Sequence, residues 1–226
     1  MKLILTSIRL LCKTGIKIIS NMKGLIYGLT LLGTLSLVSC DETARLAKDL
    51  PGSWTGTPEN FTDNSYVTAT TIETMDFSNN PELVAKGSRG GALIVVGMLS
   101  ANTQIVGEVG LVEPLGLTVS GRSTINGTWT VIDDDEVAIS LDPSTLAVSV
   151  DPDAVVVNGV VTGMNGPRID SIKPSVAVSI AQSLKMALVN RYSSIRKLDD
   201  VKIKGPLMKF EIGHTDYVFT RQDAAQ

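Results

Sequence analysis

The chain has 226 residues, 43% of them hydrophobic and 19% charged, a composition typical of one or two globular domains. Its charge is unevenly divided, because residues 1–39 hold five of the 20 basic residues and none of the 23 acidic ones. The chain from Cys40 onward therefore has a net charge of −8. Such a domain repels phosphate backbones, which argues against nucleic acid as a partner.

A basic and then apolar segment before Cys40 has the organisation of a secretory signal peptide. It begins at Met22 and Lys23, and its apolar part, residues 24–37, is too short for a stable membrane-spanning helix of about 20 residues. Residues 1–21 form a second basic and apolar stretch ahead of this complete signal. We therefore expect translation to begin at Met22; a signal peptide with a long N-terminal region is the alternative.

The tetrapeptide Leu37-Val38-Ser39-Cys40 resembles the lipobox of bacterial lipoproteins. The resemblance implies that diacylglycerol is attached to the thiol of Cys40, that residues 1–39 are removed as the signal peptide, and that the new amine is acylated, for example with palmitate. Only a thiolate is a good enough nucleophile for the first step. Because Cys12 lies upstream of the cut, Cys40 is the single mature cysteine and cannot form an internal disulfide. A secreted protein or a membrane helix with a chance cysteine are the alternatives.

Residues 40–50 are expected to form the lipidated tether, and residues 51–226 the folded domain. Asp41 and Glu42, directly after Cys40, resemble the export-signal patterns of Bacteroidetes lipoproteins. A simple solvated tether explains the two acids equally well, and the stretch could also hold a short helix.

The folded domain alternates β-type segments with turn sequences, which predicts an all-β fold. The predicted strands are residues 65–77, 90–99, 103–112, 116–125, 128–132, 136–141, 146–150, 154–157, 201–204, 207–212 and 216–221. Between two of them, Asn126-Gly127 indicates a tight turn or a bulge. Many short strands with close turns favour an antiparallel lipocalin-like β-barrel or a closed sandwich.

One segment, residues 174–191, breaks the β pattern. Val176, Ile180, Leu184 and Leu188 recur every four residues, which predicts an amphipathic helix with Pro174 in its first turn. We expect this helix to pack on the barrel or to close one end of it. Docking a partner or lying on a membrane is the alternative.

Gly52-Ser53-Trp54 resembles the Gly-x-Trp motif that opens the first barrel strand of lipocalins and other calycins. The resemblance implies that Trp54 closes one end of the barrel and that Arg221, after the last strand, stacks on it as a cation on an indole. A second Gly-x-Trp, Gly127-Thr128-Trp129, precedes an acidic turn. This order of elements resembles the lipocalin-like lipoproteins of Bacteroidetes. Both tryptophans are expected to pack in the core; ligand contact is the alternative.

No catalytic or metal site is predicted, and we expect that the protein is not an enzyme. His214 is the only histidine and lies between Gly213 and Thr215, a setting typical of a turn. No Gly-x-Ser-x-Gly, Gly-x-Gly-x-x-Gly or P-loop motif occurs in the mature chain. The acids of residues 133–136 and 151–153 could bind calcium, but acids in hairpin turns are usually solvated.

These observations predict a lipoprotein of the bacterial envelope, held by Cys40 at the outer membrane on its periplasmic face or at the cell surface. The lipocalin-like domain is expected to bind a small apolar or amphipathic ligand. A structural or interaction lipoprotein that docks an envelope partner is the alternative, and a carboxylate-based hydrolase is a third hypothesis. No cofactor is predicted apart from the covalent lipid on Cys40.

Overall fold

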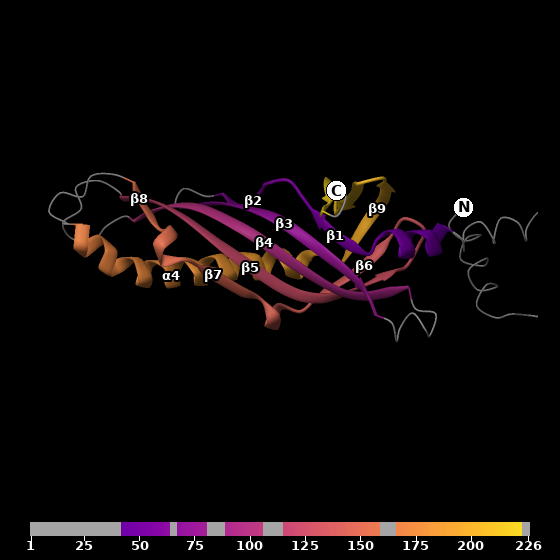
Figure 1. Ribbon diagram of the computed structural model, residues 1–226, viewed down its shortest axis with the longest axis horizontal. Coiled ribbons are helices and arrows are strands. Elements are labelled where there is room, and N and C mark those ends of the chain that lie inside the picture. The colour runs from indigo at the N-terminus through magenta and orange to yellow at the C-terminus, as the bar shows by residue number, and fades with distance from the viewer. Residues whose placement is uncertain (1–41, 64–66, 81–88, 106–114, 159–165, 223–226) are drawn as a thin grey trace, which may run out of the picture.

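The main element of the structure is a closed antiparallel β-barrel of eight strands (Figure 1). The computed structural model describes residues 42–63, 67–80, 89–105, 115–158 and 166–222. Around the barrel the strand order is β1, β11, β10, β9, β6, β5, β4 and β3, and β3 pairs with β1 to close the ring. The bounds are β1 Gly52–Thr55, β3 Val67–Asn79, β4 Gly90–Ile105, β5 Leu115–Val131, β6 Val137–Leu141, β9 Lys197–Lys204, β10 Leu207–Ile212 and β11 Thr215–Arg221. The predicted β-barrel is confirmed.

Three neighbouring strands of the barrel are much longer than the others and extend the sheet beyond it (Figure 1). β3, β4 and β5 have 13, 16 and 17 residues. At about 3.3 Å per residue, β5 alone spans about 56 Å. Shorter strands continue the sheet at its two margins: β2 (Glu59–Asp63) pairs with β3, and β7 (Ala147–Val150) and β8 (Val156–Asn158) pair with β5. The molecule is therefore elongated, with the barrel at one end and this extension at the other.

The pair Asn126-Gly127 lies inside β5 and forms no turn, so this part of the sequence prediction is wrong. Gly127 pairs with Leu93 of β4 on one side and with Leu141 of β6 on the other. A Cβ atom at Gly127 would lie 2.4 Å from the backbone oxygen of Ser140. The glycine therefore permits two strands to approach closely, and glycines of this kind occur within strands as well as in turns.

The chain runs along β5 from β6 through β7 to β8 and is interrupted twice by the same Asp-Pro turn. The 3-10 turns η1 (Pro143–Thr145) and η2 (Pro152–Ala154) each follow an aspartate whose side chain accepts a backbone N–H two residues further on. Each turn is followed by a buried aliphatic residue, Leu146 or Val155, both 2% exposed. The turns thus bend the strand and direct an apolar side chain into the core.

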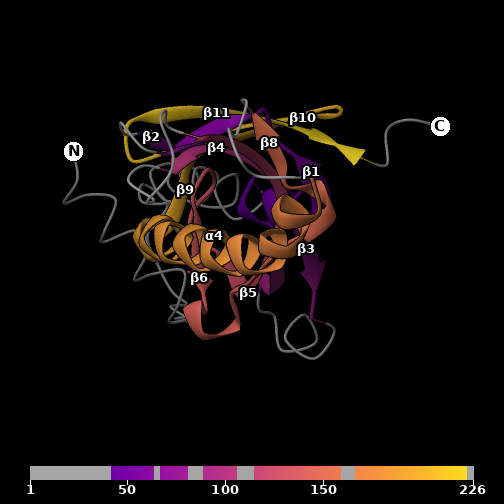
Figure 2. The same ribbon diagram turned by 90° about the vertical axis from the view of Figure 1, so that its left-hand side faces the viewer.

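Helix α4 (Gly166–Ser194) lies against the extension, as the side view and the end view show (Figures 1 and 2). It packs against β2 and β7, which are the two margins of the extension, and against both 3-10 turns. It begins eight residues before the predicted start at residue 174, and Pro174 lies inside it instead of in its first turn. Pro174 is exposed; inside a helix a proline loses its own N–H bond, and its ring crowds the carbonyl four residues earlier. Ala177, Leu184, Leu188 and Tyr192 form the buried side of the helix.

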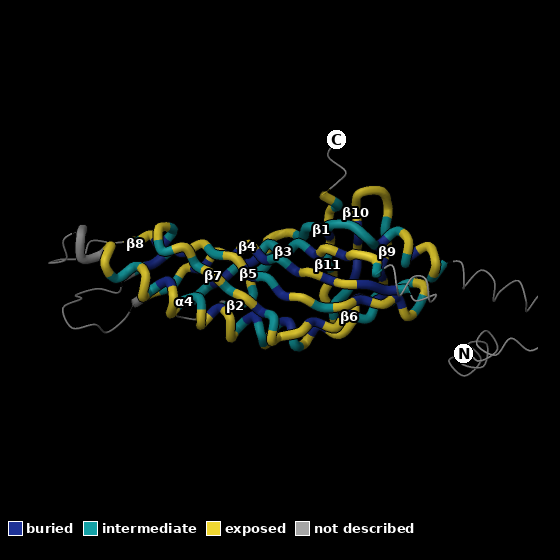
Figure 3. The backbone as a smooth tube through the Cα atoms, turned by 60° about the horizontal axis from the view of Figure 1, so that its bottom comes forward, coloured by how far each residue is buried: buried dark blue, intermediate teal, exposed yellow. Residues whose placement is uncertain are grey.

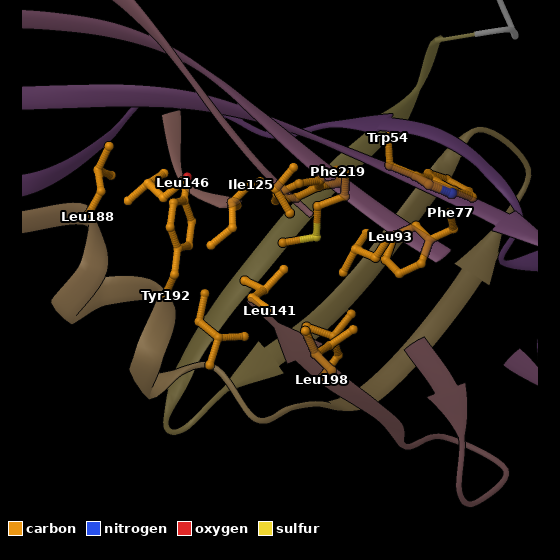
Figure 4. Close-up of a cluster of buried hydrophobic side chains, with 14 of the residues drawn as sticks. Trp54, Phe77, Leu93, Ile125, Leu141, Leu146, Leu188, Tyr192, Leu198 and Phe219 are labelled. Carbon is orange, nitrogen blue, oxygen red and sulfur yellow. The ribbon is translucent and has the colours of Figure 1, made fainter. Parts of the chain in front are cut away.

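One continuous hydrophobic core fills the barrel and the space under α4, and buried residues follow it along the molecule (Figure 3). Inside the barrel the core includes two pairs of aromatic rings among aliphatic side chains: the Phe77 and Trp129 rings meet edge to face at 5.9 Å, and the Phe210 and Phe219 rings lie 5.1 Å apart. Toward α4 it becomes aliphatic, with Leu188 and Leu146 close to Tyr192 (Figure 4). The barrel interior is therefore occupied by the side chains of the protein itself.

Candidate functional site

A helix over residues 42–49 closes the end of the barrel nearest to the predicted lipid site. Cys40 itself and residues 1–39 lie outside the described residues. Leu46 and Leu50 are 7% and 0% exposed and belong to the barrel core. From residue 42 onward, the segment predicted as a tether is therefore folded against the barrel. In the described part of the chain, no helix has the length and apolarity needed to cross a membrane.

Trp54 and Arg221 meet at this closed end. The guanidinium carbon of Arg221 lies 4.3 Å from the centroid of the fully buried Trp54 ring. Trp54 Nε1 donates a hydrogen bond to the backbone oxygen of Leu50 at 2.8 Å, and Arg221 donates to the backbone oxygens of Pro51, at 3.2 Å, and Asp49. The last carbonyls of a helix lack partners inside the helix. Trp54 and Arg221 supply these partners and tie the short helix to the barrel.

The two Gly-x-Trp motifs occupy different positions in the barrel. Gly52 has a φ angle of 132°, which residues with a side chain rarely adopt, so the first motif needs glycine for its backbone. Trp129 of the second motif is 1% exposed and donates from Nε1 to the backbone oxygen of Ser78 at 3.1 Å. Both indole rings are buried and both N–H groups are bonded. The geometry therefore gives the two tryptophans a role in packing.

A partly buried ionic cluster, which the sequence analysis missed, joins α4 to the sheet. Arg191, near the end of α4, donates from Nε to Oε1 of Glu73 at 3.0 Å and from Nη2 to Oε2 of Glu73 at 3.2 Å. Nη2 also donates to Oε2 of Glu59 at 2.6 Å. The side chains of Arg191, Glu73 and Glu59 are 18%, 6% and 25% exposed. Bidentate contacts of this kind fix the direction of the guanidinium, so the cluster holds the end of α4 on β2 and β3.

The groups of this cluster are suited to holding the helix and poorly suited to moving protons. Burial alone would lower the pKa of the Arg191 guanidinium, but Glu73 and Glu59 outweigh burial and hold that pKa above its ordinary value. Burial, and after it the charge of Glu73, raises the pKa of the Tyr192 phenol. Burial and then Glu59 raise the pKa of the Tyr217 phenol. Phenols that keep their protons at neutral pH, beside carboxylates engaged by an arginine, are weak general bases.

Three buried hydroxyl groups lie next to the cluster and have no hydrogen-bond partner among the described residues: those of Thr71, Ser123 and Tyr192. Ser123 and Glu73 lie near the Tyr192 hydroxyl, but not in hydrogen-bonding geometry. Gly97 makes room for the other two, since a Cβ atom there would lie 2.4 Å from Ser123 Oγ and 2.9 Å from Thr71 Oγ1. Buried hydroxyls are costly unless bonded, and ordered water commonly satisfies such groups. This polar layer lies where α4 meets the sheet.

The outer face of β3, β4 and β5 carries exposed apolar side chains. We call the group formed by Ile72, Ile94, Val96 and Met98 the outer apolar ridge. Ile94 and Met98 are 40% and 59% exposed, and strand pairing places Ile72 opposite Met98. Asp76 and Arg122 are the charged residues at the outward positions described on these three strands, and most of the others are Thr, Ser or Asn. A sheet face in water is normally polar, so the ridge is unusual.

The residues weighed for catalysis or metal binding are not brought together. His214 is exposed in the turn between β10 and β11, next to Gly213 with its φ angle of 66°. Among the described residues, no group of three or more His, Cys, Asp or Glu side chains is arranged to hold a metal ion. In the acidic turn after β5, burial and then the charge of Asp134 raise the pKa of the Asp135 carboxyl.

Comparison with known proteins found no relative of the chain: no family model, no curated protein and no solved structure matches it.

Proposed function

We propose that the protein is a non-catalytic lipoprotein of the bacterial envelope, anchored at the outer membrane through Cys40, whose lipocalin-like barrel presents a docking face to another envelope protein. The observation that carries the docking role is the outer apolar ridge, exposed on the outside of a barrel whose inside is filled. Support for the anchor comes from the lipobox sequence, and support for the lipocalin-like class comes from Gly52, Trp54 and Arg221 at the closed end of an eight-stranded barrel.

The filled interior favours docking over the carriage of an apolar ligand inside the barrel. Trp54, Phe77, Trp129 and Phe210 are each at most 2% exposed and occupy the space that a ligand would need. Carrier barrels instead keep a cavity, and pockets for drug-sized ligands measure about 300–1,000 Å³. A lipid-sized ligand retained by the mature domain in native mass spectrometry would support the carrier hypothesis instead.

The outer apolar ridge fits a protein partner that presents an apolar patch. Protein interfaces have an apolar centre, depleted in charge, surrounded by a polar rim. The ridge has an apolar centre with hydroxyl-bearing residues such as Thr70 and Thr124 beside it, and one charge of each sign lies at its margin: strand pairing places Asp76 opposite Ile94 and Arg122 opposite Met98.

Site-specific photo-crosslinking in cells tests the docking face. A photoreactive amino acid at Met98 should trap one dominant envelope protein. The matched control is Val178 on α4, which is also 59% exposed and lies away from the ridge. Equal adducts from both positions, or none from Met98, would refute docking through this face.

The anchor is tested separately. Cys40→Ala should abolish labelling by a clickable fatty acid and release the protein from the membrane fraction. Undiminished labelling of this variant would place the lipid elsewhere.

A further inference from the structure

The closed end of the barrel carries a groove that lies close to the predicted lipid. The short helix lines it on one side with Glu42, Arg45 and Asp49, and β9 lines it on the other with Lys202 and Lys204. The remaining lining residues are Leu46, Asp134, Val201 and Ile203. Glu42 lies two positions after Cys40, and two residue steps of chain span at most about 7 Å. A lipid on Cys40 would therefore bring the membrane surface to this groove.

A basic patch adjoins the groove on the outer face of the β9–β10 hairpin. Lys202 and Lys209 lie directly opposite each other in the strand pairing, and Lys204 lies opposite Leu207. All three lysines are exposed, and Leu207 between them is 41% exposed. Like charges directly opposite each other destabilise a sheet. Lys202 has an ion pair with Asp200 at 3.8 Å on an exposed surface, which is weak compensation. Glu42, Asp49 and Asp134 line the adjoining groove beside Arg45, Lys202 and Lys204.

We propose that this patch, Lys202, Lys204, Lys209 and Arg45, rests on the anionic phospholipid headgroups of the membrane that holds the lipid anchor. The proposal rests on the proposed lipidation of Cys40. A membrane surface is favoured over an acidic protein because the anchor fixes the membrane at this end of the molecule. The domain as a whole, with its net charge of −8, is repelled by an anionic surface, so the contact depends on the exposed lysines of the hairpin that lie within the screening length of about 8 Å of the headgroups.

The size of the groove agrees with a headgroup. Its volume is about 140 Å³, well below the roughly 300–1,000 Å³ of sites that enclose a drug-sized molecule. Three acids and three bases line it, so the groove itself has no net charge, and the exposed lysines of the hairpin supply the attraction to the headgroups.

This contact would set the orientation of the protein. With the closed end on the membrane, the extension and α4 project away from it, and the outer apolar ridge stands to the side, where a neighbouring protein can reach it. The second contact matters because a lipid on a single residue leaves the attached domain free to rotate, whereas several lysines at an anionic surface add about 1 kcal/mol each.

Lysine footprinting on a chemically tethered protein tests the proposal. Residues 40–226 contain every described residue and a single cysteine, so the thiol of Cys40 can be coupled to a maleimide lipid in vesicles. Acetylation of each lysine is then measured by mass spectrometry. On vesicles with phosphatidylglycerol, acetylation of Lys202, Lys204 and Lys209 should fall about fivefold, the factor that corresponds to about 1 kcal/mol per lysine. The exposed Lys185 of α4 should be unaffected.

Two controls decide the cause. Vesicles of phosphatidylcholine alone, and salt at about 1 M, where the screening length is about 3 Å, should both remove the protection. Equal acetylation of the three hairpin lysines and Lys185 on phosphatidylglycerol vesicles overturns the proposal, as does protection that survives on neutral vesicles. Because the maleimide replaces the natural lipid, a negative result would leave the fatty-acid labelling of Cys40 as an independent test of the anchor.

Discussion

Replacing Arg191 with methionine tests whether the ionic cluster holds α4 on the sheet. Methionine keeps much of the apolar length of the side chain but leaves Glu73, only 6% exposed, without its cation. Removing one partner of a buried ion pair costs about 3–5 kcal/mol, whereas an exposed pair contributes about 0–1 kcal/mol. Because Arg191 and Glu59 are 18% and 25% exposed, we expect a loss at the lower limit of the buried range, about 3 kcal/mol.

Chemical and thermal denaturation of residues 40–226 measure this loss. A domain of this size loses about 2–4 °C of melting midpoint per kcal/mol, hence about 6–12 °C. The matched control is Lys197→Met. Lys197 also faces two carboxylates, Glu136 at 3.4 Å and Asp199 at 2.6 Å, but it is 47% exposed, so its removal should cost less than about 1 kcal/mol. Adding Glu73→Gln to Arg191→Met removes the unpaired charge and should regain part of the stability. An Arg191→Met variant as stable as the control would refute the reasoning.

Two further predictions concern the polar layer and the acidic turn. Gly97→Ala should destabilise the folded protein by about 1–3 kcal/mol in urea denaturation, because the new Cβ meets Ser123 Oγ. Adding Ser123→Ala should restore part of this loss, and additive losses of the two variants would contradict the contact. Burial and then the charge of Asp134 raise the pKa of the Asp135 carboxyl in the folded state. Ionisation of Asp135 therefore destabilises the folded protein above that pKa, and it has no effect below the pKa of the unfolded chain, near 3.9. Asp135→Asn should therefore raise the melting midpoint at about pH 7 but not at about pH 3; an equal effect at both would refute this account.

The barrel could be predicted from local patterns because most of its strands alternate. Val137, Ile139 and Leu141 point inward from β6, and the same period along β10 buries Met208 and Phe210. Such alternation requires one buried face and one solvated face, which antiparallel barrels provide. The closure of the ring by pairing of β1 with β3 depends on contacts between distant segments, and no local pattern contains it.

The ionic cluster could not be predicted, because its members are far apart in the chain. Arg191 follows Glu73 by 118 residues and Glu59 by 132. Each of them resembles a solvated surface residue when considered alone, and only the placement of α4 across β2 and β3 brings them together. The length of α4 was missed because Pro174 is a signal for the first turn of a helix, whereas α4 begins at Gly166 and continues through Pro174.

The Arg221→Lys variant tests whether the closed end of the barrel sets the distance between the lipid proposed on Cys40 and the fold. Lysine keeps the charge but loses the planar stacking on Trp54 and one of the two bonds to the carbonyls of Asp49 and Pro51, a loss of about 1–2 kcal/mol. Hydrogen exchange should accelerate in residues 42–50, since these carbonyls end the short helix, while the amides of β4 and β5 stay protected.

The control, Arg122→Lys on the exposed outer face of β5, should change stability by less than about 0.5 kcal/mol. If exchange in residues 42–50 stays unchanged, Leu46 and Leu50 hold the helix without Arg221. If it accelerates, the helix would detach more easily from the barrel, and the variant tethered to vesicles should lose the protection of its hairpin lysines, because a longer connection to the lipid would release the basic patch from the membrane.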